Sequence, residues 1–171
     1  LELDGDAAPV TAGNFVDLVK RGVYDGTVFH RVIREPVPFV VQGGDPASSD
    51  ASTLKSQYGQ GSFIDPDSGQ ARFIPLELSY QNEEEPRYSR QSTNPSDLQK
   101  LKLNHDRGSL AMARSQSPDS ASAQSYIALR PLPELDGRYA VFGRVTDGLD
   151  VVDAIQQDDK LIKAKLLTPG L

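Results

Sequence analysis

The sequence predicts a mainly β domain, built as an antiparallel sheet or barrel with helices closing its ends. Three observations support this class: about seven short β-type runs, only two well-formed helical patterns, and no strict alternation of strand and helix. The 171 residues, 37% hydrophobic and 25% charged, have the size and composition of one ordinary globular domain. We therefore expect residues 1–171 to form a single domain.

The first elements are a strand end at residues 1–3 and a helix that starts at Pro9. A proline at the first helical position is favourable because its missing N–H would be unpaired there anyway. One face of this predicted helix carries the apolar residues Phe15, Leu18 and Val19. Gly22 can adopt the left-handed conformation that ends a helix. The predicted helix therefore ends just before Gly22.

Short runs of β-branched and aromatic residues predict the other strands. These runs are residues 28–33, 39–42, 74–78, 109–113, 125–129, 139–145 and 163–167. Between the second and third runs, residues 45–72 are rich in Gly, Ser, Asp and Pro, which predicts a long surface loop.

A second helix is expected after residue 147, with Asp147 as its N-terminal cap. Leu149, Val152 and Ile155 have the spacing of its buried face. Residues 79–104 are polar, and within them Asn94 precedes a short helical pattern that it can cap.

Charge and composition exclude several classes of function. Lys and Arg number 18 against 24 Asp and Glu, a net charge of −6 without a basic stripe, so nucleic acid is not an expected partner. The chain has no cysteine and two histidines, which argues against disulfides, thiolate catalysis and a metal site. No apolar run approaches the roughly 20 residues that cross a bilayer.

Arg31 is the first candidate for chemistry. In an extended run 28–33, it shares a face with Phe29 and Ile33, and a charge on an apolar face needs a partner or a ligand. From the strand pattern alone, the favoured interpretation is that Arg31 forms a structural ion pair with one of the many carboxylates. His30 by itself indicates a hydrogen-bonded structural histidine.

Other motifs are weak. The turn at residues 42–46 lacks the glycine spacing of a phosphate-binding loop, and no nucleophile elbow is present. The run Glu83-Glu84-Glu85 indicates a solvated loop, and no particular pair of acids suggests a carboxylate-based hydrolase.

Taken in order, a series of segments resembles the cyclophilin-type peptidyl-prolyl isomerases. Two of them are the segment Phe29-His30-Arg31-Val32-Ile33 and the segment Gln42-Gly43-Gly44-Asp45-Pro46. Further matching segments are residues 9–15, 24–26, 39, 108–113, 124, 135–137 and 141–143. Each is weak alone, but together they cover most of residues 8–153.

The resemblance implies a closed, eight-stranded antiparallel barrel capped by two helices. It also implies that the first strand is truncated here and that residues 79–104 are an insertion absent from compact members. Details such as residues 63–66 and 75–78 are similar to the cyanobacterial periplasmic and thylakoid-lumen branch, which favours the periplasm or the lumen. Because the chain has no signal-like segment, we expect a mature or trimmed fragment.

By the same resemblance, the chain catalyses cis-trans interconversion of X–Pro bonds in polypeptides and so assists protein folding. Arg31 is similar to the catalytic arginine of the family. The implied substrate-binding residues are Phe39, Val40, Gln42, Ala113, Arg114, Gln124, Tyr126, Leu135 and Tyr139. No metal and no cofactor is required, the partners are proline-containing polypeptides, and the chain is expected to be a monomer.

Several positions depart from the family pattern. Glu134 stands where a tryptophan is usual, which implies weak cyclosporin binding, and Tyr139 replaces a histidine. Val40 replaces a methionine, Arg114 replaces an asparagine, and residues 34–38 lengthen the turn beside the predicted site. These changes leave open a second function, a catalytically weak proline-peptide binding or scaffold module on the same fold.

Overall fold

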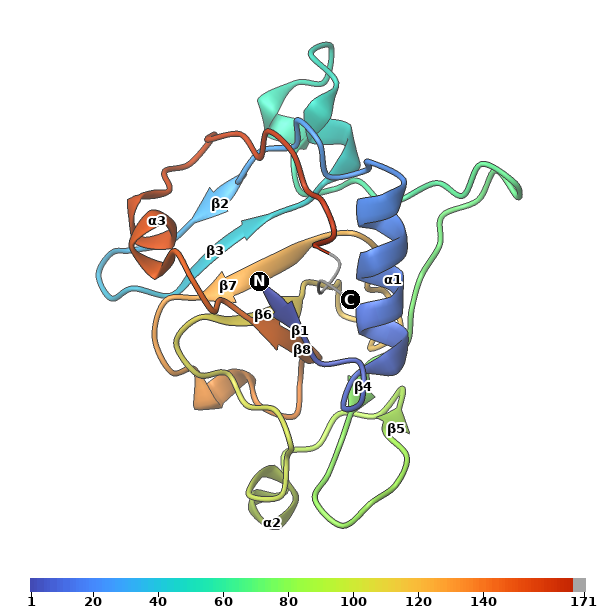
Figure 1. Cartoon of the computed structure of the whole chain (residues 1–171), viewed down its shortest axis with the longest axis vertical. Helices are drawn as coiled ribbons and strands as arrows, with labels where there is room; N and C mark the ends of the chain where they lie inside the picture. Colours follow the sequence, from blue (N-terminus) through green and yellow to red (C-terminus); the bar gives the residue numbers. More distant parts are fainter. Residues whose placement is uncertain (168–171) are drawn as a thin grey trace.

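The computed structural model describes residues 1–167 and has one central antiparallel sheet of six strands in the order β1-β8-β6-β7-β3-β2 (Figure 1). The strands are β1 (Glu2–Leu3), β2 (Arg31–Val32), β3 (Val40–Gly43), β6 (Ser109–Met112), β7 (Ser125–Ala128) and β8 (Val141–Arg144). A separate two-stranded sheet pairs β4 (Glu77–Leu78) with β5 (Arg87–Tyr88). The α-helices are α1 (Pro9–Lys20), α2 (Pro95–Leu98) and α3 (Leu149–Ala154), and short 3-10 turns cover Pro46–Ser49, Lys55–Gln57 and Pro133–Leu135.

The predicted helix at Pro9 is confirmed as α1, with Pro9 in its first turn. Ala8 at the cap position has no side-chain acceptor. The first N–H groups of α1 donate instead to a residue of β4, which is distant in the sequence. The carboxylate of Glu77 accepts from the backbone N–H groups of Val10 (3.0 Å) and Thr11 (2.8 Å). A buried negative charge at a helix N-terminus is stabilised by both the free N–H groups and the helix dipole. Glu77 therefore ties α1 to β4.

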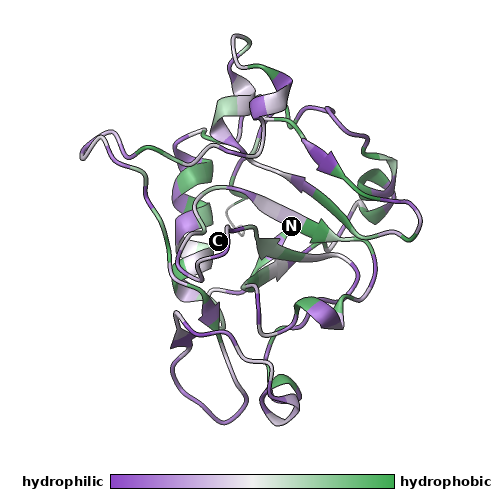
Figure 2. Ribbon diagram, turned by 180° about the vertical axis from the view of Figure 1, so that it is seen from behind, coloured by the Kyte–Doolittle hydropathy of each residue, from purple (hydrophilic) through white to green (hydrophobic). Residues whose placement is uncertain are grey.

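The main hydrophobic core lies between the central sheet and α1. Figure 2 shows apolar residues along the strands and on one side of α1, and polar residues on the loops. Phe142 and Met112 are among the most deeply buried side chains, and Phe15 of α1 packs on Phe142 with ring centroids 5.2 Å apart. The other face of the sheet carries a second cluster, which includes Val40, Tyr126 and Leu132.

The segment 79–104, which the resemblance implied to be an insertion, packs as a small layer at one end of the molecule (Figure 1). Its apolar residues Tyr80 and Leu101 are buried and form an antiparallel bridge. The short helix predicted after Asn94 is confirmed as α2, with the Asn94 side chain accepting from the N–H of Ser96. The segment is joined to the rest of the domain by a hydrogen bond from the Ser92 N–H to the carbonyl of Gly137 (2.9 Å).

The mainly β prediction is confirmed, but the prediction of a closed eight-stranded barrel capped by two helices is wrong for the described residues. Eight strands are present, divided between the open six-stranded sheet and the β4–β5 pair, and there are three α-helices. Both edge strands, β1 and β2, have only two residues. Before β2, Phe29 pairs through its backbone with Asp158 and Asp159, so the chain there does not continue toward β1.

Two local predictions near the C-terminus are also wrong. Residues 163–167 do not form a strand; instead Val28 bridges Lys160, and Leu161 exchanges backbone hydrogen bonds with Gly26 and Thr27. Asp147 does not cap α3, because Gly148 occupies the cap position with φ of +82°. A left-handed residue at this position is accessible to glycine without a Cβ penalty. Of the predicted buried face of α3, Val152 is buried, and Leu149 and Ile155 are half-buried.

Over residues 1–167, no helix has the length and apolar character needed to cross a membrane.

Candidate active site

The strand register places three predicted site residues and one neighbouring alanine in one row across the sheet. Arg31 on β2 lies opposite Gln42 on β3, and Gln42 lies opposite Tyr126 on β7. Tyr126 in turn lies opposite Ala111 on β6. Residues directly across an antiparallel ladder project on the same side of the sheet. The row therefore brings a cation, an amide and an aromatic ring together on one face.

A cleft of about 420 Å³ opens above this row. It is lined by Arg31, Phe39, Val40, Gln42, Ala113, Arg114, Tyr126, Leu135 and Tyr139. These are nine of the ten residues that the sequence resemblance selected. The tenth, Gln124, lines an adjoining hollow of about 540 Å³ that shares Gln42, Ala113 and Arg114 with the cleft.

Arg31 lies at the mouth of the cleft and its side chain is exposed. Its Nη1 donates to Oε1 of Gln42 (3.2 Å), and its guanidinium carbon is 6.0 Å from the centre of the Phe39 ring. In the described part of the chain this guanidinium has no carboxylate partner. The ion-pair interpretation of Arg31 is therefore wrong, and its remaining N–H groups are free to bind a ligand.

The expected apolar face around Arg31 is also corrected. Phe29 and Val32 pack against the same core cluster, although strict alternation would put them on opposite faces. Alternation fails because only Arg31 and Val32 belong to the β2 ladder, while the backbone of Phe29 is bonded to residues 158 and 159. Arg31 consequently faces the cleft without being buried in the core.

A chain of side-chain hydrogen bonds holds Arg31 in orientation. Gln42 Nε2 donates to Gln124 Oε1 (3.3 Å), and Gln124 Nε2 donates to the carbonyls of Gly59 (3.0 Å) and Gly61 (2.9 Å). The loop that presents these carbonyls is held by the fully buried Asp45, whose Oδ2 accepts from the N–H of Gly59 (2.6 Å). Fixing both amides in this way fixes the acceptor that Gln42 offers to the guanidinium.

Tyr126 forms the buried wall of the cleft and belongs to a network that sequence reasoning missed. Its hydroxyl lies 2.9 Å from Nε2 of His105, and Nδ1 of His105 lies 2.8 Å from Oδ1 of Asp136. The same carboxylate oxygen accepts from the backbone N–H of His105 (2.8 Å). Asp136 Oδ1 therefore accepts a hydrogen bond from the Nδ1–H of His105, and Nε2 accepts one from the Tyr126 hydroxyl. The one sequence signal was that His105 is one of two histidines in the chain.

Tyr126, His105 and Asp136 are hydrogen-bonded in the order of a nucleophilic triad, but the environment of Tyr126 does not activate its hydroxyl as a nucleophile. Burial raises the pKa of the Tyr126 phenol well above its ordinary value, and the nearby Tyr139 adds to this. A nucleophile needs the opposite shift or direct deprotonation by its base. The network is therefore suited to hold the ring of Tyr126, which packs edge-on against Tyr139 with centroids 6.0 Å apart.

Arg114 lies on the other side of Tyr139. Its guanidinium carbon is 4.7 Å from the centre of the Tyr139 ring, and its Nε and Nη2 both donate to the carbonyl of Arg138. Nη1 donates to the carbonyls of Ser115 and Gln116. Arg114 thus orders the tract after β6 and the ring of Tyr139 at the same time.

Two of the five expected departures from the family pattern, residues 34–38 and Glu134, are held in place by arginines. In the lengthened turn 34–38, Arg34 Nη2 donates to the carbonyls of Val152 (3.0 Å) and Ile155 (2.7 Å) at the end of α3. Glu134, which the resemblance places where a tryptophan is usual, pairs with Arg130 at 2.6 Å. Neither residue lines the cleft.

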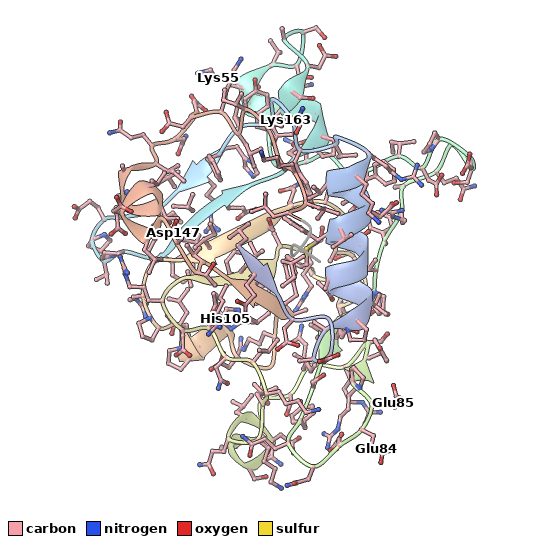
Figure 3. All side chains as sticks on the ribbon, viewed as in Figure 1. Lys55, Glu84, Glu85, His105, Asp147 and Lys163 are labelled. Atoms are coloured by element: carbon pink, nitrogen blue, oxygen red, sulfur yellow. The ribbon has the colours of Figure 1, made fainter. Side chains whose placement is uncertain are left out.

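The acidic groups elsewhere do not gather into a site. Across residues 1–167 there is no group of three or more His, Asp or Glu side chains arranged to hold a metal ion. Figure 3 shows Glu84 and Glu85 at the outer edge of the inserted segment, pointing away from the sheet, as expected for a solvated loop. His105, by contrast, lies within the body of the domain in the same view.

Comparison with known proteins gives a consistent result. The family model "cyclophilin type peptidyl-prolyl cis-trans isomerase" matches residues 1–167. A peptidyl-prolyl cis-trans isomerase of Helicobacter pylori is 34% identical over 173 residues, covering 100% of this chain and 82% of that protein. A thylakoid lumen peptidyl-prolyl cis-trans isomerase of Synechocystis sp. is 35% identical, covering 97% of this chain and 43% of that protein.

A chloroplastic relative from Arabidopsis thaliana is 39% identical over 99% of this chain, which amounts to 38% of that protein. The chain therefore spans less than half the length of the Synechocystis and Arabidopsis relatives. Among solved structures, a cyclophilin type isomerase of Cryptosporidium parvum, crystallised in the presence of the dipeptide Ala-Pro, matches with a TM-score of 0.62 and 26% identity. The match covers 94% of this chain and 83% of that one.

Proposed function

The chain belongs to the family of cyclophilin-type peptidyl-prolyl cis-trans isomerases, and on that basis we propose that it accelerates rotation about X–Pro bonds in polypeptides. The observation that carries the proposal is the position of Arg31. An unpaired guanidinium stands at the mouth of a cleft whose wall is made of Phe39, Val40, Tyr126 and Leu135. Catalysis of prolyl rotation needs a hydrogen-bond donor for the twisted amide and an apolar surface for the proline ring, and the cleft offers both.

The chemical problem is the resonance of the amide. Nitrogen shares its lone pair with the carbonyl, so rotation must cross a barrier of roughly 18–20 kcal/mol. When the bond is half turned, the lone pair is localised on nitrogen, which becomes a hydrogen-bond acceptor, and conjugation to the carbonyl is lost. A catalyst therefore needs a donor that meets this twisted state, and no covalent intermediate is involved.

Arg31 is proposed as that donor. Its guanidinium is always charged and offers several N–H groups in a fixed fork, so it can stabilise the twisted amide without transferring a proton. Its hydrogen bond to Gln42 uses one N–H of Nη1 and leaves other donors for the substrate. A preorganised donor of this kind contributes about 3–4 kcal/mol once the bound peptide has excluded water.

The apolar wall is proposed to hold the proline ring while the rest of the peptide turns. Val40 and Tyr126 are buried and Phe39, Leu135 and Tyr139 are half-buried, so the wall is rigid on one side and open on the other. Positioning of this type contributes several kcal/mol. Lowering the barrier by about 7 kcal/mol gives roughly 10⁵-fold acceleration.

Gln42, Gln124, Ala113 and Arg114 are proposed to line the path of the peptide on either side of the proline. The support is their shared position around the cleft and its adjoining hollow. We further propose that residues 1–171 act as one domain, because β1 near the N-terminus pairs with β8 and the cleft residues are drawn from positions 31–139. We also propose that this domain acts as a monomer.

A second candidate function is a proline-peptide binding module with negligible turnover, on the same cleft. The lengthened turn 34–38 and the missing tryptophan at Glu134 favour it, since both lie beside the site. The free guanidinium of Arg31 favours the enzyme, because peptide binding alone does not require an unpaired charge there.

A protease-coupled assay on a short Xaa-Pro peptide separates the two. We expect the wild-type protein to accelerate isomerisation, and Arg31→Ala to lose most of kcat while the Kd for the peptide changes by less than about threefold. Lys20→Ala, an exposed cation on α1, is the matched control and keeps full turnover. Binding without any rate above background in the wild type would establish the scaffold function instead.

A further inference from the structure

A second hollow of about 440 Å³ adjoins the proposed proline cleft. It is lined by Gln91, Arg114, Ser115, Gln116, Arg138 and Tyr139. Arg114 and Tyr139 also line the cleft, so the two depressions adjoin at these two side chains. Gln91 comes from the inserted segment 79–104, so this hollow owes part of its wall to that insertion.

The lining of this hollow is positive in a chain of net charge −6. It contains two arginines and no acidic residue. Neither Arg114 nor Arg138 has a carboxylate partner in residues 1–167. By comparison, Arg87 of the same insertion is paired with Glu83. The positive charge is therefore concentrated at the hollow and is not neutralised there.

The two arginines differ in how they can meet a ligand. Arg114 donates to the carbonyls of Arg138, Ser115 and Gln116, which fixes its position but leaves its charge intact because those partners are neutral. Arg138 is exposed and its side chain donates to no other described residue. A fixed charge beside a free guanidinium is an arrangement that suits a carboxylate, which accepts two parallel hydrogen bonds from arginine.

We propose that this hollow binds an acidic side chain, Asp or Glu, of the polypeptide whose X–Pro bond occupies the cleft. This inference rests on the proposed function for the cleft and adds a substrate class to it. A peptide that fills the cleft reaches the hollow by passing Tyr139, so the acidic residue flanks the X–Pro pair within a few positions. The insertion 79–104 then contributes to substrate selection through Gln91.

Fluorescence anisotropy with labelled peptides tests the assignment directly. The peptides share a neutral sequence around an Ala-Pro pair. Each carries a single Glu or, in its matched partner, a single Gln, placed at one of the two positions before the pair or the two positions after it. At one of these positions we expect Glu to bind about two- to fivefold more tightly than Gln at low salt, as for an exposed ion pair. The preference should shrink above about 0.15 M salt, where the screening length is about 8 Å.

Arg138→Glu should abolish or reverse the preference, whereas Lys20→Glu makes the same change in net charge away from the hollow and should retain it. Arg114 is left unchanged because it orders the tract after β6. Equal affinities for the Glu and Gln peptides at all four positions overturn the assignment. Turnover of the Gln peptides is measured separately: its absence in the wild type contradicts the proposed function, while the anisotropy comparison still decides the hollow.

Discussion

The hydroxyl of Tyr126 and Nε2 of His105 lie 2.9 Å apart beneath the cleft, and both side chains are almost completely buried. The Tyr126 ring, which forms one wall of the cleft, is therefore held in place by a buried hydrogen bond to His105. A buried hydroxyl without a partner costs about 1–3 kcal/mol, so His105 supports the position of Tyr126. Asp136 completes the support by fixing the tautomer of His105.

The Tyr126–His105 pair is expected to show strong coupling in a double-mutant cycle. Tyr126→Phe leaves Nε2 of His105 unpaired and should lower the free energy of unfolding by about 1–2 kcal/mol. In a His105→Leu background the same change removes a hydroxyl that already lacks a partner, and it should cost nothing or raise stability. Urea unfolding of the four proteins measures the coupling, and simple additivity would show that the contact contributes nothing.

The same Tyr126→Phe variant separates structural support from chemistry. Because burial raises the pKa of the phenol, Tyr126 stays protonated, and the ring alone forms the cleft wall. We expect kcat on an Xaa-Pro peptide to change by less than about threefold. A complete loss of turnover in a folded Tyr126→Phe protein would assign the hydroxyl a direct chemical part.

Cyclosporin should bind weakly to this protein. The family resemblance implies that a tryptophan normally holds the drug at the position of Glu134, and here that residue is paired with Arg130. Glu134→Trp should tighten binding by about tenfold, equivalent to about 1.4 kcal/mol, by adding an aromatic contact. Calorimetric titration of both proteins measures this, with Glu84→Trp as a control on the exposed insertion loop. Nanomolar affinity of the wild type would contradict the expectation.

Removing the distant cap of α1 should destabilise the domain. Glu77→Ala leaves the N–H groups of Val10 and Thr11 and the Thr11 hydroxyl without their acceptor, and we expect a loss of about 3 kcal/mol in the free energy of unfolding. Glu77→Gln keeps one acceptor oxygen and should lose less. Glu84→Ala, on an exposed loop, should change stability by less than about 0.5 kcal/mol. Urea denaturation with matching m-values provides the comparison.

Elements determined by nearby residues could be predicted from the sequence. Helix α1 follows from Pro9 and an i, i+3, i+4 apolar spacing, and α2 follows from the Asn94 cap. The order of the strands and the open edge could not be predicted, because they depend on pairings between distant segments. The same reason explains the false strand at 163–167, since the backbone near Thr27 pairs with residues 160 and 161 instead.

The cleft was predictable residue by residue only through the family resemblance. Composition and periodicity alone singled out Arg31 and favoured an ion pair that is not formed. What the sequence could not give is the support behind the cleft: His105 and Asp136 are 31 residues apart, and Asp45 reaches Gly59 across 14 residues. Contacts at such separations follow from the fold and leave no local pattern.

Stability should fall as the pH drops from 7 toward 5, and His30 should account for a measurable part of that loss. Burial lowers the pKa of His30 below its ordinary value, and the nearby Arg31 acts in the same direction while Asp45 opposes it. In the unfolded chain the imidazole titrates near about 6.5. Below that pH the unfolded state therefore binds a proton more readily than the folded state, which favours unfolding.

The contribution of His30 is thus fully present above the unfolded pKa and is lost as the pH falls through the folded pKa. His30→Gln removes the titrating group and should reduce the slope of unfolding free energy against pH between about 7 and 5, a window above the ordinary range of carboxyl groups. Urea unfolding at half-unit intervals gives the slope for both proteins. Glu84→Gln, on an exposed loop, leaves both histidines in place, should keep the slope close to that of the wild type and serves as the comparison. Identical slopes for the wild type and His30→Gln would mean that the acid sensitivity arises elsewhere.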